Sequence, residues 1–332
     1  MQKNVVWAGN AYFASHMRNA GYHVVVLPRN LDVVTWSDVV THCGGVPDVF
    51  IYGDCSRQPF LKDVESFMCA TVFYAIDTHI HSWYQRYAQA FDLCCVAMRD
   101  HLAGFAGHRL ESDQLRWLPL FAKDQDRPIP SGDKPRYEVV FVGKNDPQLT
   151  PGRYALLKAL GDRVPLTVLQ GGYAELYSRA KLVLNVSEHG DLNFRVFETL
   201  GCGACLITPR VGHGLLDLFT DGEELFTYDS NDVPSLVSLI SKLLSDETKR
   251  RVVAAAGLSA VDMKHRAATR GQEFIEWLRA HDLSQLAKRR LAARDLIRRD
   301  YLRLLYLHLA QAESSAARAR MYLDFAGPGT VM

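Results

Sequence analysis

Long apolar runs are absent from this 332-residue sequence. No stretch approaches the ~20 consecutive apolar residues that a membrane-spanning helix needs, so no transmembrane segment is predicted. The first residues, Met-Gln-Lys, lead directly into a strand-like pattern and not into the apolar core of a signal peptide. An excess of one charge is also lacking, because 38 Lys and Arg oppose 37 Asp and Glu. This balance predicts no nucleic-acid partner.

Cysteine is scarce, and its spacing is uninformative. The seven cysteines are an odd number, and most lie in apolar segments. Cys202 and Cys205 form a C-x-x-C, but no second such pair and no His pair follows them. This argues against a zinc or redox site and favours small buried thiols. A reducing, cytoplasmic location fits best.

The first ~120 residues contain a regular alternation of short apolar runs and amphipathic stretches. This length is that of one ordinary domain, which has ~100–200 residues. Strands alternating with helices predict a parallel sheet covered on both faces. We therefore expect a Rossmann-like α/β domain over residues 1–122. Its strands are predicted at Asn4–Ala8, His23–Leu27, Val49–Tyr52, Thr71–Ile76, Leu93–Met98 and Leu115–Leu120, with helices that include Tyr12–Ala20 and Ser82–Phe91.

The alternation stops at residues 123–136, a stretch rich in Pro, Asp and Gly that is typical of an interdomain linker. Asp124 and Asp126 form a D-x-D there, but no strand surrounds them, which argues against a metal role. A second Rossmann-like domain is predicted over 137–260, and a cleft between two such domains is a common ligand site. Its strands are expected at Glu138–Val142, Leu166–Leu169, Lys181–Val186, Cys205–Thr208 and Glu224–Tyr228, and its helices include Arg153–Leu160, Ala174–Arg179, Asn193–Leu200, Val233–Leu244 and Thr248–Leu258.

The pattern from about Val261 onward is entirely helical, and Leu302, Leu305 and Leu309 fall on one helical face. Residues 280–332 are predicted to be a basic helical tail. A solvated face of a helix that packs on the core or forms a homodimer is the favoured interpretation. The alternative is contact with an acidic acceptor, a partner or, through the 280–310 helix, an anionic membrane surface. The basic cluster comprises Lys288, Arg289, Arg290, Arg294, Arg298, Arg299 and Arg303.

The strongest chemical signal is the segment Leu182–Thr208. A strand ends near Val186, a polar loop follows, and a helix begins near Asn193, which is placed to cap it. The amino end of a helix at the carboxyl end of a parallel strand binds phosphate well. Arg195 can add a bidentate contact to a diphosphate, and the carboxylate of Glu198 can accept two hydroxyl groups of a ribose.

This segment resembles the donor region of retaining, group-1 glycosyltransferases of the GT-B kind. It is most similar to the CgeB-like (spore-maturation protein) branch, whose pattern is an "LN" strand, an "R-x-F-E" and a glycine turn. The sequence supplies Leu184-Asn185, Arg195-Val196-Phe197-Glu198 and Gly201-Cys202-Gly203. Phe141–Pro147 looks like the opening strand and glycine turn of the donor domain. The helix that begins near His265, within residues 261–279, looks like the helix that crosses back to the first domain.

The resemblance implies a fold of two Rossmann-like domains facing a cleft, with the nucleotide-sugar donor bound by the second. Glu198 would bind ribose and Arg195 phosphate. The family's E-x7-E is not matched, because nine residues separate Glu188 from Glu198, but Glu188 stays a candidate near the transferred sugar. The remaining donor-site candidates are Gly143, Lys144, Gln170, Gly171, Asn185, Asn193 and Arg153. For Arg153, a solvated position on a helix is an equal alternative.

The acceptor is expected in the first domain. Asp77, His79 and His81 follow a central strand, where polar side chains face the ligand edge of the sheet. Asp77 or His79 would act as base if the reaction inverts, and would only orient the acceptor if it retains. No third ligand accompanies His79 and His81, so no metal is expected. Gly9-Asn10 lacks the G-x-G-x-x-G spacing of a dinucleotide fold.

The resulting hypothesis is a metal-independent glycosyltransferase of the hexosyltransferase type. The resemblance favours retention over inversion at the anomeric carbon. It would move a sugar from a nucleoside-diphosphate sugar to an unknown hydroxyl acceptor (glycan, protein or lipid-linked) without a cofactor. Arg195, Lys144 and a helix N-terminus would stabilise the leaving diphosphate. Two alternatives stay open: a nucleotide-sugar epimerase of GT-B shape, and a catalytically inactive sugar-binding or scaffold protein.

Overall fold

The computed structural model describes residues 2–130 and 135–327, which divide into two compact units. The first unit combines residues up to Pro119 with those from Gly271 onward, and the second unit spans Leu120–Arg270. The boundary between them falls inside one helix, α10 (Ala267–Arg279). No helix in the described ranges is both long and apolar enough to cross a membrane.

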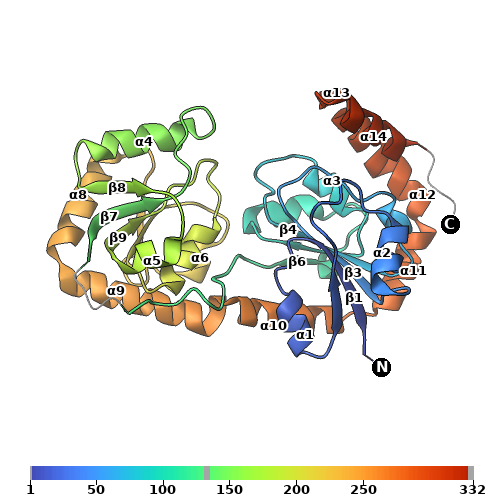
Figure 1. The fold of residues 1–332 in the computed structure, drawn as a ribbon, viewed down its shortest axis with the longest axis horizontal. Coiled ribbons are helices and arrows are strands. Elements are labelled where there is room, and N and C mark those ends of the chain that lie inside the picture. Colours follow the sequence, from blue (N-terminus) through green and yellow to red (C-terminus); the bar gives the residue numbers. More distant parts are fainter. Residues whose placement is uncertain (1, 131–134, 328–332) are drawn as a thin grey trace. The chain divides into compact units, whose positions relative to one another are not determined.

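The first unit contains a six-stranded parallel sheet in the order β2-β1-β3-β4-β5-β6. Figure 1 labels β1, β3, β4 and β6 of this sheet. The order reverses at β1, because β2 and β3 lie on opposite sides of it. All the predicted strands of this half are present. They are β1 (Asn4–Gly9), β2 (His23–Val26), β3 (Val49–Gly53), β4 (Ala70–Ala75), β5 (Leu93–Val96) and β6 (Leu115–Trp117), and the first three helices are α1 (Ala14–Asn19), α2 (Trp36–Cys43) and α3 (Tyr84–Ala88).

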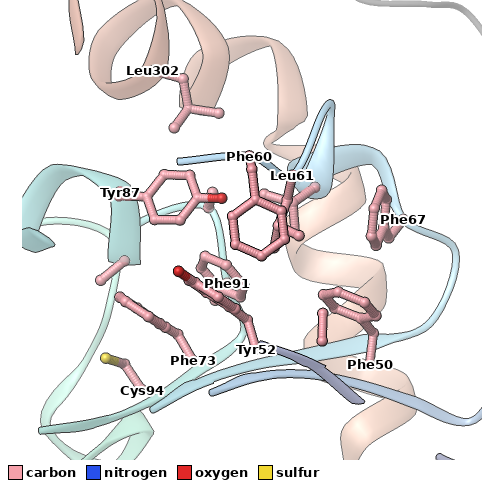
Figure 2. Packing of buried hydrophobic residues seen from close by; sticks show 14 of the residues in the cluster. Phe50, Tyr52, Phe60, Leu61, Phe67, Phe73, Tyr87, Phe91, Cys94 and Leu302 are labelled. Carbon is pink, nitrogen blue, oxygen red and sulfur yellow. The ribbon is translucent and has the colours of Figure 1, made fainter. Parts of the chain in front are cut away.

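Alternate side chains of these strands enter two separate apolar layers, as expected for a sheet covered on both faces. Trp7 and Tyr74 point to one face, where they meet Phe13, and Trp7 also meets Phe274 of α10. The opposite face carries a cluster of aromatic rings, in which Tyr52 and Phe73 stack with centroids 5.0 Å apart. Figure 2 shows this cluster between the sheet and the helical segment that bears Leu302.

The C-terminal helices complete the core of the first unit. They are α11 (Leu283–Ala292), α12 (Arg294–Ile297), α13 (Arg303–Ala312) and α14 (Ala316–Ala326), with a π-helical turn at Arg298–Leu302. Leu302, Leu305 and Leu309 are buried in the aromatic cluster, as their helical spacing predicts. Residues 280–327 therefore pack on the first sheet, and residues 328–332 of the predicted tail lie outside the described residues.

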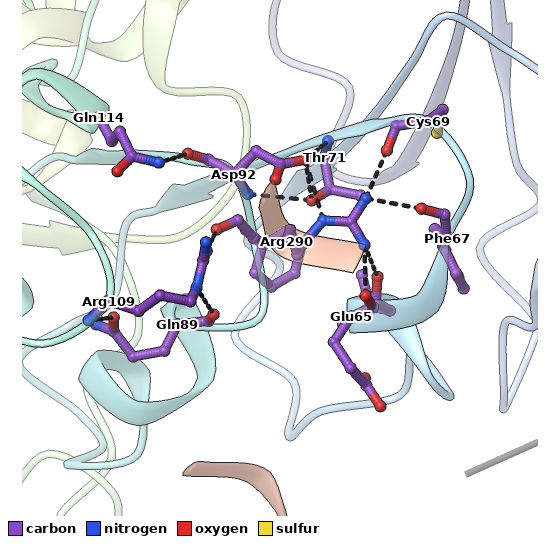
Figure 3. A network of polar contacts seen from close by, with 11 residues as sticks. Glu65, Phe67, Cys69, Thr71, Gln89, Asp92, Arg109, Gln114 and Arg290 are labelled. Atoms are coloured by element: carbon purple, nitrogen blue, oxygen red, sulfur yellow. Dashed lines mark hydrogen bonds and ion pairs between the residues drawn. The ribbon is translucent and has the colours of Figure 1, made fainter. Parts of the chain in front are cut away.

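Part of the basic cluster is buried instead of solvated. Arg290 is fully buried and donates to the carboxylate of Asp92 at 3.0 Å (Figure 3). It also donates to four backbone carbonyl groups, those of Val64, Glu65, Phe67 and Cys69, at 2.6–3.2 Å. Arg298 donates to the carboxylates of Asp63 and Glu65. These two arginines join the C-terminal helices to the segment between β3 and β4, so neither belongs to a free basic surface.

The second unit contains a five-stranded parallel sheet in the order β11-β10-β9-β7-β8. Figure 1 labels β7, β8 and β9 of this sheet. Here the order reverses at β7, which pairs with both β8 and β9. The strands are β7 (Tyr137–Val142), β8 (Leu166–Leu169), β9 (Ala180–Leu184), β10 (Leu206–Pro209) and β11 (Phe226–Tyr228), and the helices before α10 are α4 (Pro151–Gly161), α5 (Tyr173–Ser178), α6 (Phe194–Gly201), α7 (Leu215–Leu218), α8 (Val233–Ser245) and α9 (Glu247–Ala260).

The described part of the predicted linker packs on the second unit. Asp126 is buried, and its carboxylate accepts hydrogen bonds from the backbone of Lys123 and the hydroxyl of Tyr173, each at 2.8 Å. Ala122 forms a parallel bridge with Arg266, whose guanidinium reaches the carbonyl of Asp126. The linker prediction also covers 131–134, which lie outside the described residues.

Candidate functional site

A pocket of about 380 Å³ opens in the second unit at the carboxyl end of its sheet. It lies where β7 ends and the strand order reverses, the place where ligands bind in open parallel sheets. The sequence candidates Gly143, Lys144, Gln170, Gly171, Arg195 and Glu198 all line it, together with Val142, Tyr173 and Tyr177.

Arg195, in the first turn of α6, is held in a fixed orientation beside this pocket. Its Nε donates to the carbonyl of Val142 at 3.1 Å, and its Nη1 donates to Oδ1 of Asn185 at 2.8 Å. The guanidinium lies over the ring of Phe141, 5.0 Å from its centroid. Asn185 does not line the pocket; it is buried and holds Arg195, while its own amide donates to Thr208. Arg195 therefore reaches across the ends of β7 and β9 with its charge preorganised.

A second cation lies on the same ring. Arg153 is 5.7 Å from the centroid of Phe141, and its Nη1 donates to the carbonyl of Lys144 at 3.0 Å. Its Nε is buried without a hydrogen-bond partner among the described residues. Burial, and then the nearby charge of Arg195, lower the pKa of Arg153. Two converging guanidinium groups with an unused donor suit an anionic ligand.

Glu188 has a clear structural contact. Its carboxylate accepts hydrogen bonds from the backbone N–H of Gly152 at 2.9 Å and of Arg153 at 2.8 Å. These are free N–H groups in the first turn of α4, where a carboxylate is stabilised by the helix dipole. Glu188 therefore caps α4 from a distant loop, and a role near the transferred sugar stays a prediction.

Glu198 is nearly buried, with 16% of its side chain exposed. Burial is the largest cause that raises the pKa of Glu198, opposed by the ammonium group of Lys123, whose Nζ lies 3.7 Å away. Lys123 also donates to the hydroxyl of Tyr173 at 3.0 Å, and that hydroxyl donates to Asp126. Sequence reasoning missed this support for Glu198, although Tyr173 lies only two residues after the candidate Gly171.

The prediction that Asn193 caps α6 is wrong in its chemistry. Asn193 occupies the N-cap position with extended backbone, but its side chain makes no capping hydrogen bond. Its Oδ1 is buried and has no partner within the described ranges. The amino end of α6 is thus left without a side-chain cap, so its N–H groups are not satisfied in the usual way.

The acceptor candidates of the first unit follow β4. Asp54 is buried, and its Oδ2 accepts from the backbone N–H of Ile76 at 3.0 Å and of Asp77 at 2.9 Å. The hydroxyl of Ser56 donates to the carboxylate of Asp77. His79 and His81 lie beyond the end of β4 and not within a strand, so they do not share a strand face. The ring of His81 stacks on Trp83 with centroids 5.8 Å apart.

The C-x-x-C thiols are buried, and the two carboxylates of the D-x-D are hydrogen bonded. The part of the chain that the structure describes contains no group of three His, Cys, Asp or Glu side chains able to hold a metal ion. Cys202 and Cys205 are free and buried, and burial raises the pKa of each thiol to about 12. Asp124 and Asp126 of the D-x-D are both engaged by backbone N–H groups.

Comparison with known proteins agrees with this geometry. Residues 134–276 match the family described as "Glycosyl transferase-like". No curated protein matches the sequence.

Solved structures similar to the chain include three with low identity and high coverage. A sucrose-phosphate synthase from Thermosynechococcus elongatus is 13% identical over 84% of this chain and 99% of its own, with a TM-score of 0.59. Anabaena Alr3699/HepE in complex with UDP-glucose is 11% identical over 84% and 100%, with a TM-score of 0.63. A UDP-forming α,α-trehalose-phosphate synthase from Burkholderia xenovorans is 9% identical over 86% and 100%, with a TM-score of 0.57. The chain thus has the two-domain GT-B fold of glycosyltransferases, and the match to the family covers residues 134–276.

Proposed function

We propose that the protein transfers a hexosyl group from a nucleoside-diphosphate sugar to a hydroxyl acceptor, with retention, without a metal ion and in the cytoplasm. The arrangement of Arg195 carries the proposal. Its guanidinium is fixed between the ends of β7 and β9 and shares one pocket with the nearly buried carboxylate of Glu198. The Arg195–Glu198 motif supports a place in the CgeB-like branch.

In this proposal the difficult event is departure of the diphosphate from the anomeric carbon. Arg195 and Lys144 stabilise the charge that develops on the leaving oxygen, and the uncapped amino end of α6 adds its dipole. Because Arg195 is already held by the carbonyl of Val142 and by Asn185, little reorganisation is needed. Glu198 accepts hydrogen bonds from the two ribose hydroxyls, and Gln170 and Gly171 lie beside the base.

The acceptor side of the reaction rests on Asp77 and His79. The carboxylate of Asp77 is oriented by the hydroxyl of Ser56, and its backbone is fixed by Asp54. With retention, the leaving diphosphate takes the acceptor proton, so Asp77 and His79 orient the hydroxyl. Uridine is the first nucleotide to test, because one structural relative was solved with UDP-glucose and another is named as UDP-forming.

The test is calorimetric titration of the full chain with UDP, GDP, dTDP, ADP and CMP. We expect one diphosphate to bind, and Glu198→Gln to weaken it by about tenfold or more, because a ribose hydrogen bond to a carboxylate is worth about 1.5–3 kcal/mol. Glu175→Gln is the matched control, since Glu175 is exposed and pairs with Arg179 one turn away. If no nucleotide binds the folded protein, the proposal is wrong.

As the pH falls, nucleotide binding should weaken at a higher pH than it would if Glu198 had the pKa of an ordinary glutamate. Glu198 must be ionised to accept both ribose hydroxyls, and burial raises its pKa in the protein. Binding is therefore complete above the raised pKa and is lost as the pH falls through it. A pH series on wild type and Glu198→Gln checks this, because the variant should lack that transition.

Gly143→Ala should displace Arg195. A Cβ at position 143 would lie 2.8 Å from Nη2 of Arg195 and 3.2 Å from the Phe141 ring. We expect the affinity for the nucleoside diphosphate to fall by about tenfold, the value of one charge-assisted hydrogen bond. Gly161→Ala is the control, since nothing lies within 4 Å of its added Cβ. Equal affinities in the two variants would count against the assigned role of Arg195.

One observation favours the inactive sugar-binding alternative. Glu188 deviates from the family spacing and is engaged at the amino end of α4. Measuring the release of free nucleotide from the donor, with and without candidate acceptors, distinguishes a glycosyltransferase from an inactive sugar-binding protein. Donor binding without turnover would select the binding protein.

A further inference from the structure

A second pocket, of about 230 Å³, lies in the first unit. Most residues around it lie at the ends of three strands: Gly9 ends β1 and Asn10 follows it, Leu27 to Arg29 follow β2, and Cys55 and Arg57 follow β3. The sheet order reverses at β1, so this pocket occupies the same topological position in the first sheet as the Arg195 pocket does in the second. Ligands of open parallel sheets bind at such positions.

The backbone at the ends of β1 and β3 is closely packed beside this pocket. A Cβ on Gly9 would lie 2.1 Å from the carbonyl oxygen of Gly53, and one on Gly53 would lie 2.0 Å from that of Asn10. Only glycine allows the ends of β1 and β3 to approach so closely. Asn10 is then fixed by its amide, which donates to the hydroxyl of Tyr12 and the carbonyl of Asp54.

Two arginines stand at this pocket. Arg29 donates to Oδ1 of Asn10 at 2.7 Å, and Arg57 lies over the ring of Phe60, 4.6 Å from its centroid. The Nη1 of Arg57 points towards the carbonyl groups of Arg29 and Leu31, at 3.4 Å. Both guanidinium groups are thus oriented by neutral partners, which leave their charge uncompensated.

No acidic residue lines the pocket, and neither arginine contacts a carboxylate in the described ranges 2–130 and 135–327. Other cations of the same unit do contact carboxylates, since Arg290, Arg298 and Lys62 each pair with an Asp or Glu. Two like charges beside one half-apolar cavity repel one another unless an anion lies between them. Arginine forks bind phosphate and carboxylate groups with matching geometry.

We propose that this pocket binds the acceptor, and that the acceptor carries a phosphate or carboxylate group held by Arg29 and Arg57. The inference rests on the proposed glycosyl transfer and names the substrate class of that reaction. The apolar side chains of Leu27, Val34 and Phe60 contact the carbon skeleton of the acceptor, while the arginines fix its charged end.

The experiment is calorimetric titration of the full chain with glucose 6-phosphate, glycerol 3-phosphate and glucuronate, at a saturating concentration of the nucleoside diphosphate that binds wild type. Glucose tests the need for charge, and inorganic phosphate tests whether a free ion suffices. Wild type is expected to bind at least one anionic compound, and Arg29→Gln with Arg57→Gln to weaken it tenfold or more. Arg86→Gln with Arg303→Gln removes the same charge from exposed positions of the same unit and should leave binding unchanged.

Several outcomes would overturn the proposal: no binding by any of the anionic compounds, equal binding of glucose, equal binding of inorganic phosphate, or a loss that is the same in the control. Failure of the proposed function is seen separately. It would appear as absent binding of every nucleoside diphosphate, whereas failure here leaves nucleotide binding intact and sensitive to Arg195. A Tm measured for each variant without ligand verifies that it is folded.

Discussion

Arg290→Met is expected to lower the free energy of unfolding by about 3–5 kcal/mol, the usual cost of breaking a buried ion pair from one side. Arg290 and Asp92 are 0% and 1% exposed in their side chains. Methionine fills much of the volume but leaves Asp92 as a buried charge without its cation. It also leaves the carbonyl groups of Val64, Glu65, Phe67 and Cys69 without their donor.

Urea unfolding measures this effect, with Arg289→Met as the control. Arg289 is the neighbouring residue on α11 and is exposed, so its replacement should change stability by less than about 0.5 kcal/mol. Should Arg290→Met fail to fold, Arg290→Lys keeps the charge and loses the five-donor fork, and should be intermediate. Equal stability of the two methionine variants would show that the network of Figure 3 contributes little.

The second large effect is expected for Arg195→Lys, which should weaken binding of the nucleoside diphosphate by about 10- to 100-fold. Lysine keeps the charge, but its single ammonium nitrogen does not reproduce the planar fork with which Nε and Nη1 of Arg195 reach Val142 and Asn185. The loss should therefore come from geometry and not from net charge. Calorimetry with the diphosphate that binds wild type gives the change directly.

Arg163→Lys is the matched control, because Arg163 is exposed on the same unit. The Asn185→Leu variant adds a second measurement. Asn185 contacts Arg195 and is not at the pocket surface, so it acts by positioning, and its loss should weaken binding less than Arg195→Lys does. Unchanged affinity in Arg195→Lys would remove the observation on which the proposed function rests.

The strand pattern was predictable because each strand is short, nearly continuous in apolar residues and bounded by polar turns. β4 (Ala70–Ala75) is buried throughout, and the sequence predicted a doubly covered strand there. The donor pocket was predictable for a related reason. Its side chains follow strands directly, as Gly143 follows β7 and Gln170 follows β8, and the carboxyl ends of parallel strands meet at one edge.

Contacts between distant segments were not predictable from local pattern. Asp126 reads as part of a polar linker, yet it is buried against Tyr173, 47 residues away. Arg290 sits in a run of basic residues that suggests a solvated face, and only the packing of α11 against the β3–β4 segment shows it to be internal. Arg29 and Arg57 are separated in the sequence by α2 and β3 and were not singled out, because a pocket formed by three strand ends has no local signature.

The division of the chain also sets an order of events during synthesis. The second unit is continuous, from Leu120 to Arg270, whereas the first needs residues from both ends. As the ribosome proceeds from the amino end, the first sheet emerges early, but Tyr306, Tyr322 and Phe325 of its core come last. The second unit can thus mature while the first still exposes its aromatic rings. A nascent or truncated chain that ends before Arg290 would leave Asp92 unpaired and this surface open to chaperones and to aggregation.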